Sequence, residues 1–245
     1  MTKNKIYFAS DFHLGHHVSG SFEREKKIVR WLDLIKKDAK SIYLIGDIFD
    51  FWFEYNNVIP KGCVRLLGKI AEITDSGVEI NIIVGNHDLW MKDYLINECG
   101  VKIFHKPIKI KVSDKTIFLG HGDGLGPGQY KFKFLKKVFK NKFCQWIFSK
   151  IHPNIALRIA HYWSKYSREH GESPSYLGSE NEFIEQFCIH HSKNNPEINF
   201  YIFGHRHLPL EKKINESCQY INTGDWINHC SYAVYHDEKI LLKYL

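Results

Sequence analysis

The segment SIYLIGDIFD, residues 41–50, joins a strand-like apolar run to a polar turn. Apolar and aromatic residues fill positions 42–45, as in a β-strand that is buried on both faces. A Gly-Asp pair follows at once, and a second aspartate comes three positions later. Four other strand-like runs end in a short polar cluster of the same kind. These clusters are Ser10-Asp11-Phe12-His13, Gly85-Asn86-His87-Asp88, Gly120-His121-Gly122-Asp123 and Gly204-His205-Arg206-His207.

Helix-compatible stretches lie between the first strand-like runs, at residues 22–39 and 61–76. Their alternation with strands predicts a layered α/β domain. In such folds, ligands collect beyond the carboxyl ends of the strands, so the five polar clusters are expected to converge. A length of 245 residues with 44% hydrophobic and 25% charged residues excludes a disordered, collagenous or membrane-spanning protein.

The converging side chains are of the types that bind metal ions. Carboxylate, imidazole and amide oxygen together suit manganese, iron, zinc or cobalt, whereas an all-oxygen set would favour magnesium or calcium. Asp47 has two carboxylate oxygens and can bridge two ions. The seven candidate ligands, enough for two shells that share Asp47, are Asp11, His13, Asp47, Asn86, His121, His205 and His207.

Each polar cluster alone is weak evidence, because the chain contains 15 histidines and a single histidine motif is often a surface feature. The five clusters together, in this order and each after a strand-like run, are strong evidence for a metal centre. A metal-free binding module on the same fold is a different interpretation. It would have no need to keep all seven ligand positions filled.

The ordered motifs resemble those of the calcineurin-like metallophosphoesterases, which carry D-x-H, G-D-x-x-D, G-N-H-D or G-N-H-E, a later histidine and G-H-x-H. The match runs from Asp11 to His207. The resemblance implies a four-layer α-β-β-α sandwich and two divalent metal ions, with manganese the expected metal. One ion would be held by Asp11, His13, Asp47 and His207. The other would be held by Asp47, Asn86, His121 and His205.

Asp50-Phe51-Trp52 and Asn222-Thr223-Gly224-Asp225-Trp226 are similar to motifs in one diphosphatase branch of that family. This branch cleaves the pyrophosphate of UDP-2,3-diacylglucosamine in lipid A biosynthesis, and it releases UMP and 2,3-diacylglucosamine 1-phosphate. It also carries a helical cap before the last motif. The resemblance implies a core at residues 1–123 and 181–245 and a cap at 124–180. His87 stands where the best-known members of the branch have arginine.

The expected catalytic residues are Asp47, which would bridge the ions, and His87. His87 would stabilise developing charge or protonate the leaving oxygen. Asp50 or Asp88 would orient the metal ligands without binding the ions themselves. The expected substrate contacts are Asn86, His87, Asp123, Ser164, Ser167, Arg168 and His205.

The chain has a net charge of +7, and its basic character is concentrated in one segment. From Gly124 to Arg168 there are ten Lys or Arg residues and no Asp or Glu. On a helical wheel, one apolar stripe predicts an amphipathic helix that docks on the core. This stripe contains Phe132, Leu135, Phe139, Phe143, Trp146 and Ile147. A second apolar surface, formed by Phe134, Val138 and Phe148, is expected to line a groove for acyl chains.

Lysines beside an apolar surface attract anionic lipid head groups, so we expect peripheral association with the cytoplasmic face of the inner membrane. The N-terminal MTKNKIYFAS lacks a leader-type apolar stretch, and the six scattered cysteines indicate reduced thiols. Both observations favour a cytoplasmic protein. An enzyme acting on a nucleotide or nucleic acid phosphodiester is the alternative. The apolar stripe argues against it, so no nucleic acid partner and no obligate protein partner are expected.

Overall fold

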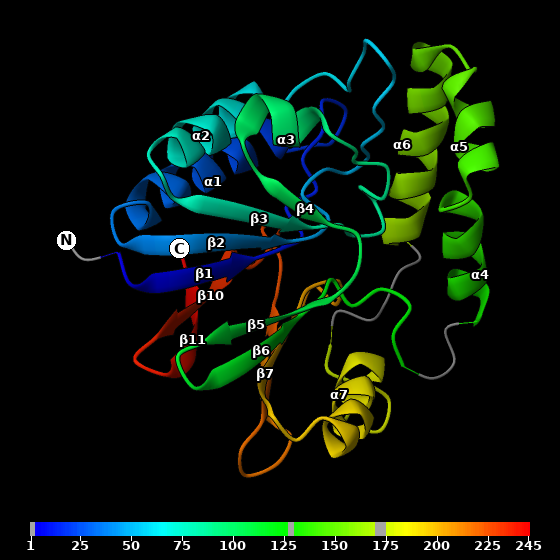
Figure 1. Ribbon diagram of the computed structural model, residues 1–245. Coiled ribbons are helices and arrows are strands. Elements are labelled where there is room, and N and C mark those ends of the chain that lie inside the picture. The colour runs from blue at the N-terminus through cyan, green and yellow to red at the C-terminus, as the bar shows by residue number, and fades with distance from the viewer. Residues whose placement is uncertain (1–2, 127–129, 170–174) are drawn as a thin grey trace.

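The computed structural model describes residues 3–126, 130–169 and 175–245, and it leaves the side chains of residues 131, 132 and 167–169 undescribed. Two β-sheets face each other in this part of the chain (Figure 1). The first sheet has the strand order β11 (Lys239–Tyr244), β10 (Ser231–His236), β1 (Lys5–Ala9), β2 (Ala39–Ile45), β3 (Glu79–Ile83) and β4 (Lys102–Phe104). The second has the order β5 (Ile108–Val112), β6 (Lys115–Leu119), β7 (Ile198–Phe203), β9 (Gln219–Thr223) and β8 (Pro209–Lys213).

The space between the sheets is filled by apolar side chains from both of them. Phe8 and Ile45 of the first sheet belong to one buried cluster with Ile117, Leu119 and Ile202 of the second. Because side chains alternate along a strand, the other face of each sheet must be covered separately.

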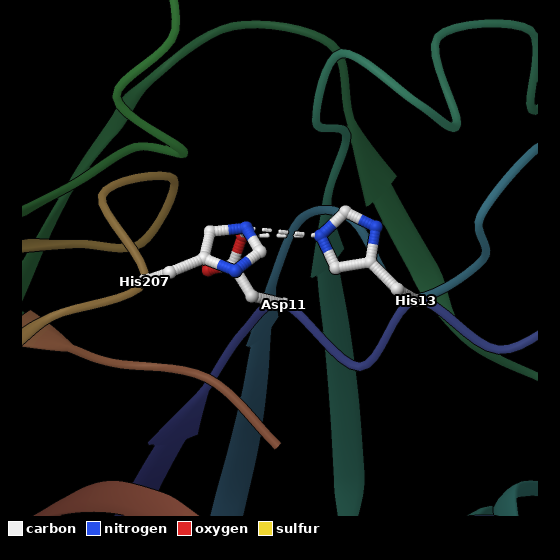
Figure 2. Close-up of side chains that lie close together, drawn as sticks. All are labelled: Asp11, His13 and His207. Atoms are coloured by element: carbon white, nitrogen blue, oxygen red, sulfur yellow. Dashed lines mark hydrogen bonds and ion pairs between the residues drawn. The ribbon is translucent and has the colours of Figure 1, made fainter. Parts of the chain in front are cut away.

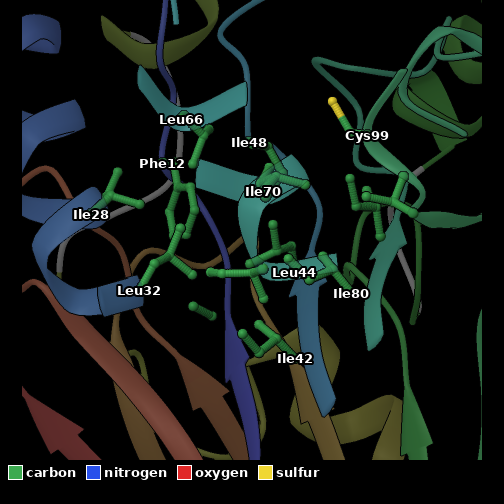
Figure 3. Packing of buried hydrophobic residues seen from close by; sticks show 14 of the residues in the cluster. Phe12, Ile28, Leu32, Ile42, Leu44, Ile48, Leu66, Ile70, Ile80 and Cys99 are labelled. Atoms are coloured by element: carbon green, nitrogen blue, oxygen red, sulfur yellow. The ribbon is translucent and has the colours of Figure 1, made fainter. Parts of the chain in front are cut away.

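Helices cover the outer faces. On the first sheet lie α1 (Ser21–Ile35), α2 (Val64–Asp75) and α3 (Tyr94–Cys99). Figure 3 shows Ile28 and Leu32 of α1 and Leu66 and Ile70 of α2 in one buried cluster with Leu44 of β2. On the second sheet lies α7 (Phe183–Asn194), whose Ile184 packs in a cluster with Tyr201 and Phe203 of β7. The predicted α/β sandwich is confirmed.

Three further helices, α4 (Tyr130–Phe139), α5 (Lys142–Ser149) and α6 (Pro153–Glu169), lie together beside the sandwich, near the edge where β2 and β3 end (Figure 1). They fall within the predicted cap. Trp90 of the core donates a hydrogen bond of 2.6 Å from Nε1 to the carbonyl oxygen of Phe139, at the C-terminus of α4. Within the described ranges, no helix combines the length and apolar content that crossing a bilayer requires.

The prediction of one continuous amphipathic helix was wrong. Helix α4 ends at Phe139. The Asn141 side chain then accepts hydrogen bonds from the backbone nitrogens of Phe143 and Cys144, so it caps a new helix, α5. Because α5 is a separate helix, its side chains do not continue the two surfaces predicted for one helix. Phe143 and Trp146 of the predicted docking stripe are 65% and 56% exposed.

Phe148, predicted to lie on the second surface, instead packs against core aromatic rings. Its ring centroid is 4.8 Å from that of Trp90 and 4.9 Å from that of Phe53. Phe134, the other predicted aromatic of that surface, is 69% exposed. Over α5 the predicted docking stripe is therefore exposed, and Phe148 of the second surface faces the core.

Candidate metal centre

The polar clusters follow β1, β2, β3, β6 and β7, and parallel pairing places their ends side by side. Backbone hydrogen bonds continue the pairing of β1 and β2 into the turns, from Asp11 N to Gly46 O and from His13 N to Asp47 O, at 3.1 and 2.9 Å. In the second sheet, Gly204 N donates to His121 O at 3.0 Å. The turns that carry the candidate ligands are thus fixed to one another by the main chain.

The first group of candidate ligands is Asp11, His13 and His207, drawn in Figure 2. Their ligand atoms lie within 4.8 Å of one another. His207 Nε2 is 3.2 Å from Asp11 Oδ1 and 3.1 Å from His13 Nε2. Ring nitrogens and a carboxylate oxygen therefore point at one shared volume.

The second group is Asp47, His121 and His205, and Asn86 joins it. His121 Nε2 lies 3.3 Å from Asp47 Oδ2 and 3.1 Å from Asn86 Oδ1. Asp47 Oδ2 is also 3.7 Å from His13 Nε2 of the first group. Asp47 therefore lies between the two groups, as a bridging carboxylate must.

Five of the candidate ligands have a left-handed backbone. The φ angles of Asp11, His13, Asp47, His205 and His207 are 57°, 43°, 53°, 68° and 53°. This conformation is uncommon outside glycine, and a residue held in it stores roughly 1–3 kcal/mol of strain, which the surrounding structure must offset.

Arg24 of α1 supplies part of that support. It is buried, and its guanidinium donates hydrogen bonds to the carbonyl oxygens of Phe12 and His13 at 2.7 and 2.8 Å. A charged donor held inside the protein makes strong hydrogen bonds, so Arg24 fixes the turn that carries Asp11 and His13.

Two glycines allow the turns to approach closely. A Cβ atom at Gly85 would overlap the side chain and backbone nitrogen of Asp47, and one at Gly204 would overlap Ser10 and Asp11. A side chain at Gly85 would displace the bridging carboxylate of Asp47, and a side chain at Gly204 would displace Asp11.

The buried charges favour a cationic occupant. Burial lowers the pKa of His121, but the nearby carboxylate of Asp47 outweighs this effect and raises the pKa to about 10. In the same way, burial lowers the pKa of His207, and Asp11 outweighs it and raises the pKa to about 10. Without a metal, the two carboxylates thus draw protons onto two imidazoles. By contrast, burial lowers the pKa of His205 to about 3, and the nearby His121 also contributes.

The residues fit two divalent cations. Oδ1 of Asp11 is fully buried, and the groups nearest to it are ring nitrogens of other candidate ligands, at 3.2 Å for His207 Nε2 and 3.7 Å for His13 Nε2. A buried carboxylate oxygen surrounded by imidazole nitrogens needs a cation for charge balance, and either a protonated imidazole or a metal ion supplies it. The mixed set of carboxylate, imidazole and amide oxygen is the donor chemistry of borderline divalent metals.

A second layer of carboxylates supports the ligands. Asp88 accepts hydrogen bonds from the backbone nitrogens of Gly85 and Ile48 at 2.7 and 2.8 Å. Asp225 Oδ2 lies 3.3 Å from His207 Nδ1. Asp225 belongs to the Asn-Thr-Gly-Asp-Trp motif that begins in the last residues of β9, and it was not among the predicted site residues. Such contacts fix the orientation of a ligand ring.

The predicted substrate contacts are only partly brought together. His87 Nδ1 lies 2.9 Å from the carbonyl oxygen of Asp50 and 3.1 Å from Oγ of the buried Ser164 on α6. Asp123 instead forms an ion pair with Lys136 of α4. The side chains of Ser167 and Arg168 lie outside the described residues.

A cavity of about 320 Å³ opens beside His87. We call it the aromatic cavity. Asn86, His87 and Ser164 lie among its lining residues, and the rest of the lining is mainly apolar and comes from both the sandwich and helices α4, α5 and α6. These apolar residues include Phe51, Trp52, Trp90, Leu135, Phe139, Phe148, Ile159 and Trp163.

Residues 4–209 match the calcineurin-like phosphoesterase family, and the chain therefore belongs to this family of metal-dependent phosphoesterases. The chain is 37% identical to a UDP-2,3-diacylglucosamine hydrolase of Porphyromonas gingivalis, with 98% of this chain and 97% of that protein covered. Proteins of the same name from Histophilus somni and Vibrio vulnificus are 25% and 26% identical over 91% of this chain, and 92% and 90% of their own lengths are covered.

We expect Gly85→Ala to weaken metal binding at least tenfold, because the added Cβ displaces Asp47. Gly68→Ala is the matched control. Gly68 lies within α2 with open space around its Cα, and alanine there should stabilise the helix by up to ~1 kcal/mol. Metal titration and thermal unfolding check both changes. Metal affinity in Gly85→Ala equal to that of the wild type would contradict the assigned packing.

Metal binding should release about two protons per protein at pH 7, because His121 and His207 must lose their protons to act as ligands. Both pKa values are raised to about 10, so the protons are bound at neutral pH and the apparent metal affinity should rise as the pH increases toward 10. Calorimetry in buffers of different ionisation enthalpy measures the release. A metal affinity independent of pH between 7 and 9 would contradict it.

Proposed function

We propose that the protein hydrolyses the pyrophosphate bond of UDP-2,3-diacylglucosamine, giving UMP and 2,3-diacylglucosamine 1-phosphate. The observation that carries this proposal is the aromatic cavity, which places a mainly apolar volume directly beside a candidate metal centre. Burial of acyl chains in such a volume is favourable, whereas a small soluble phosphate ester has little apolar surface to bury there. Similarity to proteins named UDP-2,3-diacylglucosamine hydrolase agrees with a diacylated sugar nucleotide as substrate.

The metal ions would be held by Asp11, His13, Asp47 and His207 on one side and by Asp47, Asn86, His121 and His205 on the other. We propose manganese as the metal. When bound, a pair of divalent ions supplies Lewis acidity toward the phosphoryl oxygens and activates water for attack. The protein's part is to hold these ligands in place, through the strained turns and the carboxylates behind them.

His87 is the proposed acid or charge-stabilising residue. A carbonyl oxygen only accepts hydrogen bonds, so the contact with Asp50 O places a proton on Nδ1 and leaves Nε2 toward the centre, 3.9 Å from Asp47 Oδ2. Burial lowers the pKa of His87 to about 4. It is therefore neutral at pH 7 in the metal-free protein, and a phosphoryl group near Nε2 would favour its protonated, donating form.

Ser164 ties the cap to this chemistry because its hydroxyl reaches His87 from α6. We propose that Asn86, Asp123, Ser167, Arg168 and His205 also contact substrate, and for Asp123 the match of its position with the family motif supports this. For Asp123, the pairing with Lys136 would instead hold α4 against the core until substrate binds.

We further propose that residues 124–180 act as a cap on a core formed by 1–123 and 181–245, and that the cap meets the cytoplasmic surface of the inner membrane. Trp146, Ile147 and Tyr162 are exposed on the cap, at 56%, 47% and 76%. Exposed aromatic side chains beside lysines fit an anionic lipid surface.

Chelation should abolish hydrolysis, and manganese should restore more activity than magnesium, because imidazole ligands disfavour magnesium. The experiment compares initial rates with UDP-2,3-diacylglucosamine after EDTA treatment and after addition of each ion, with metal content measured. Full activity in protein shown to be free of metal would refute the metal requirement, whereas no activity with any added ion would favour the binding-module interpretation.

Phe148→Ala should lower kcat/KM for UDP-2,3-diacylglucosamine at least tenfold, about 1.4 kcal/mol, with little change for bis(p-nitrophenyl) phosphate. The ring lines the aromatic cavity, and only a substrate with acyl chains would reach it. Phe143→Ala is the matched control, since Phe143 lies on the same helix but does not line the cavity. Equal losses on both substrates would make Phe148 a purely structural residue, and Phe148→Leu tests this with less loss of packing.

A further inference from the structure

A second groove borders the candidate metal centre on the side of the turn after β1. Its volume is about 350 Å³, and it lies between residues 14–17, residues 58–63 and the first turns of α6. The side chains of Leu14, Phe49 and Trp52 form a buried floor. Five basic side chains also line it, and we call it the imidazole groove. They are His16, His17, Lys61, Arg158 and His161.

A row of side chains connects the groove to the metal centre. Asp50 Oδ1 is 3.7 Å from Nδ1 of the candidate ligand His13, and Asp50 Oδ2 is 3.8 Å from His161 Nδ1. The ring centroids of His161 and His17 are 4.9 Å apart, as are those of His17 and His16. Only the side chain of Asp50 therefore separates His161, which lines the groove, from the candidate metal ligand His13.

The groove has a one-sided charge. Neither Asp nor Glu is among its lining residues. Within the described ranges, Lys61 and Arg158 form no ion pair, so their charges are available to a ligand. Burial lowers the pKa of His17, and His161, His16 and Lys61 lower it further, which reflects a positive potential in the groove. A basic rim above an apolar floor suits a ligand that joins a flat ring to an anionic group.

We propose that the imidazole groove binds the uridine nucleotide arm of the substrate. This inference rests on the proposed function, whose substrate has one lipid arm and one nucleotide arm on either side of the pyrophosphate. The two arms differ in chemistry and require different subsites. The aromatic cavity suits the lipid arm, and the imidazole groove shares Phe51 and Trp52 with it as a common wall.

A third cavity beside the centre is a poorer site for the nucleotide. It lies next to His121, its volume is about 210 Å³, and its Lys136 is already paired with Asp123. Small-molecule sites are typically about 300 Å³ or larger, which the imidazole groove satisfies. Arg158 in the groove also offers a guanidinium, which can bind a phosphate through two parallel hydrogen bonds.

The test is UMP binding to the metal-loaded, full-length protein by calorimetry. Lys61→Ala combined with Arg158→Ala should raise the Kd for UMP at least tenfold, because two charges that face the nucleotide are removed. The control is Lys27→Ala combined with Arg30→Ala, which removes the same charge from the exposed face of α1. In the control, the Kd for UMP should stay within about twofold of the wild-type value. Inorganic phosphate serves as a probe of the metal centre alone, and its Kd should change less than about threefold in both double variants.

Several results would overturn the proposal. They are the absence of UMP binding to the wild type, an unchanged Kd for UMP in the groove variant, and equal losses for UMP and inorganic phosphate. Retained UMP binding with lost binding to phosphatidylglycerol vesicles would make the groove a membrane contact instead. Turnover of UDP-2,3-diacylglucosamine by the wild type is measured separately. Its absence would refute the proposed function, whereas the UMP affinities decide the groove.

Discussion

The buried carboxylate of Asp47 is the group on which the arrangement of this site depends. It is 1% exposed, and imidazoles from three different turns surround it. An ionised carboxylate inside a protein needs compensating charge and hydrogen bonds. Its Oδ1 accepts a hydrogen bond from His87 N at 2.9 Å, while Oδ2 faces the imidazoles. The turns that carry these imidazoles, and Gly85, which lets its turn approach Asp47 closely, are placed around this one group.

Both sheets contribute to that environment, which explains why the site lies at an end of the sandwich. Parallel strands β1, β2 and β3 end at one edge of the first sheet, and β6 and β7 end at one edge of the second. Apolar packing between the sheets holds these edges together. The packed interior of the sandwich therefore aligns the candidate metal ligands. These ligands lie in turns directly after the strands and not in long loops.

The core and the convergence of the polar clusters were predictable because both follow from local patterns. Apolar runs of strand length determine the sheets, and a polar cluster after each parallel strand must lie at a common edge. Helices α4 and α5 were harder to predict. On a helical wheel, Asn141 is an ordinary polar residue. In the structure its side chain caps the start of α5, and in this separate helix Phe148 lies against Trp90. His161 was missed because its partner Asp50 is 111 positions away in the chain, and no motif marks it.

The hydrogen bond from Trp90 to the carbonyl oxygen of Phe139 has an evolutionary consequence. Every amino acid carries that carbonyl, so the attachment of α4 to the core survives replacement of the Phe139 side chain. The side chain itself lines the aromatic cavity. A point mutation of Phe139 can thus change the shape of the cavity wall, while the hydrogen bond that attaches α4 to the core is kept. Loss of the ring would cost its packing against Trp90 and Trp163, yet the backbone attachment of α4 would remain, so related chains can differ at this position and still keep α4 bound to the sandwich.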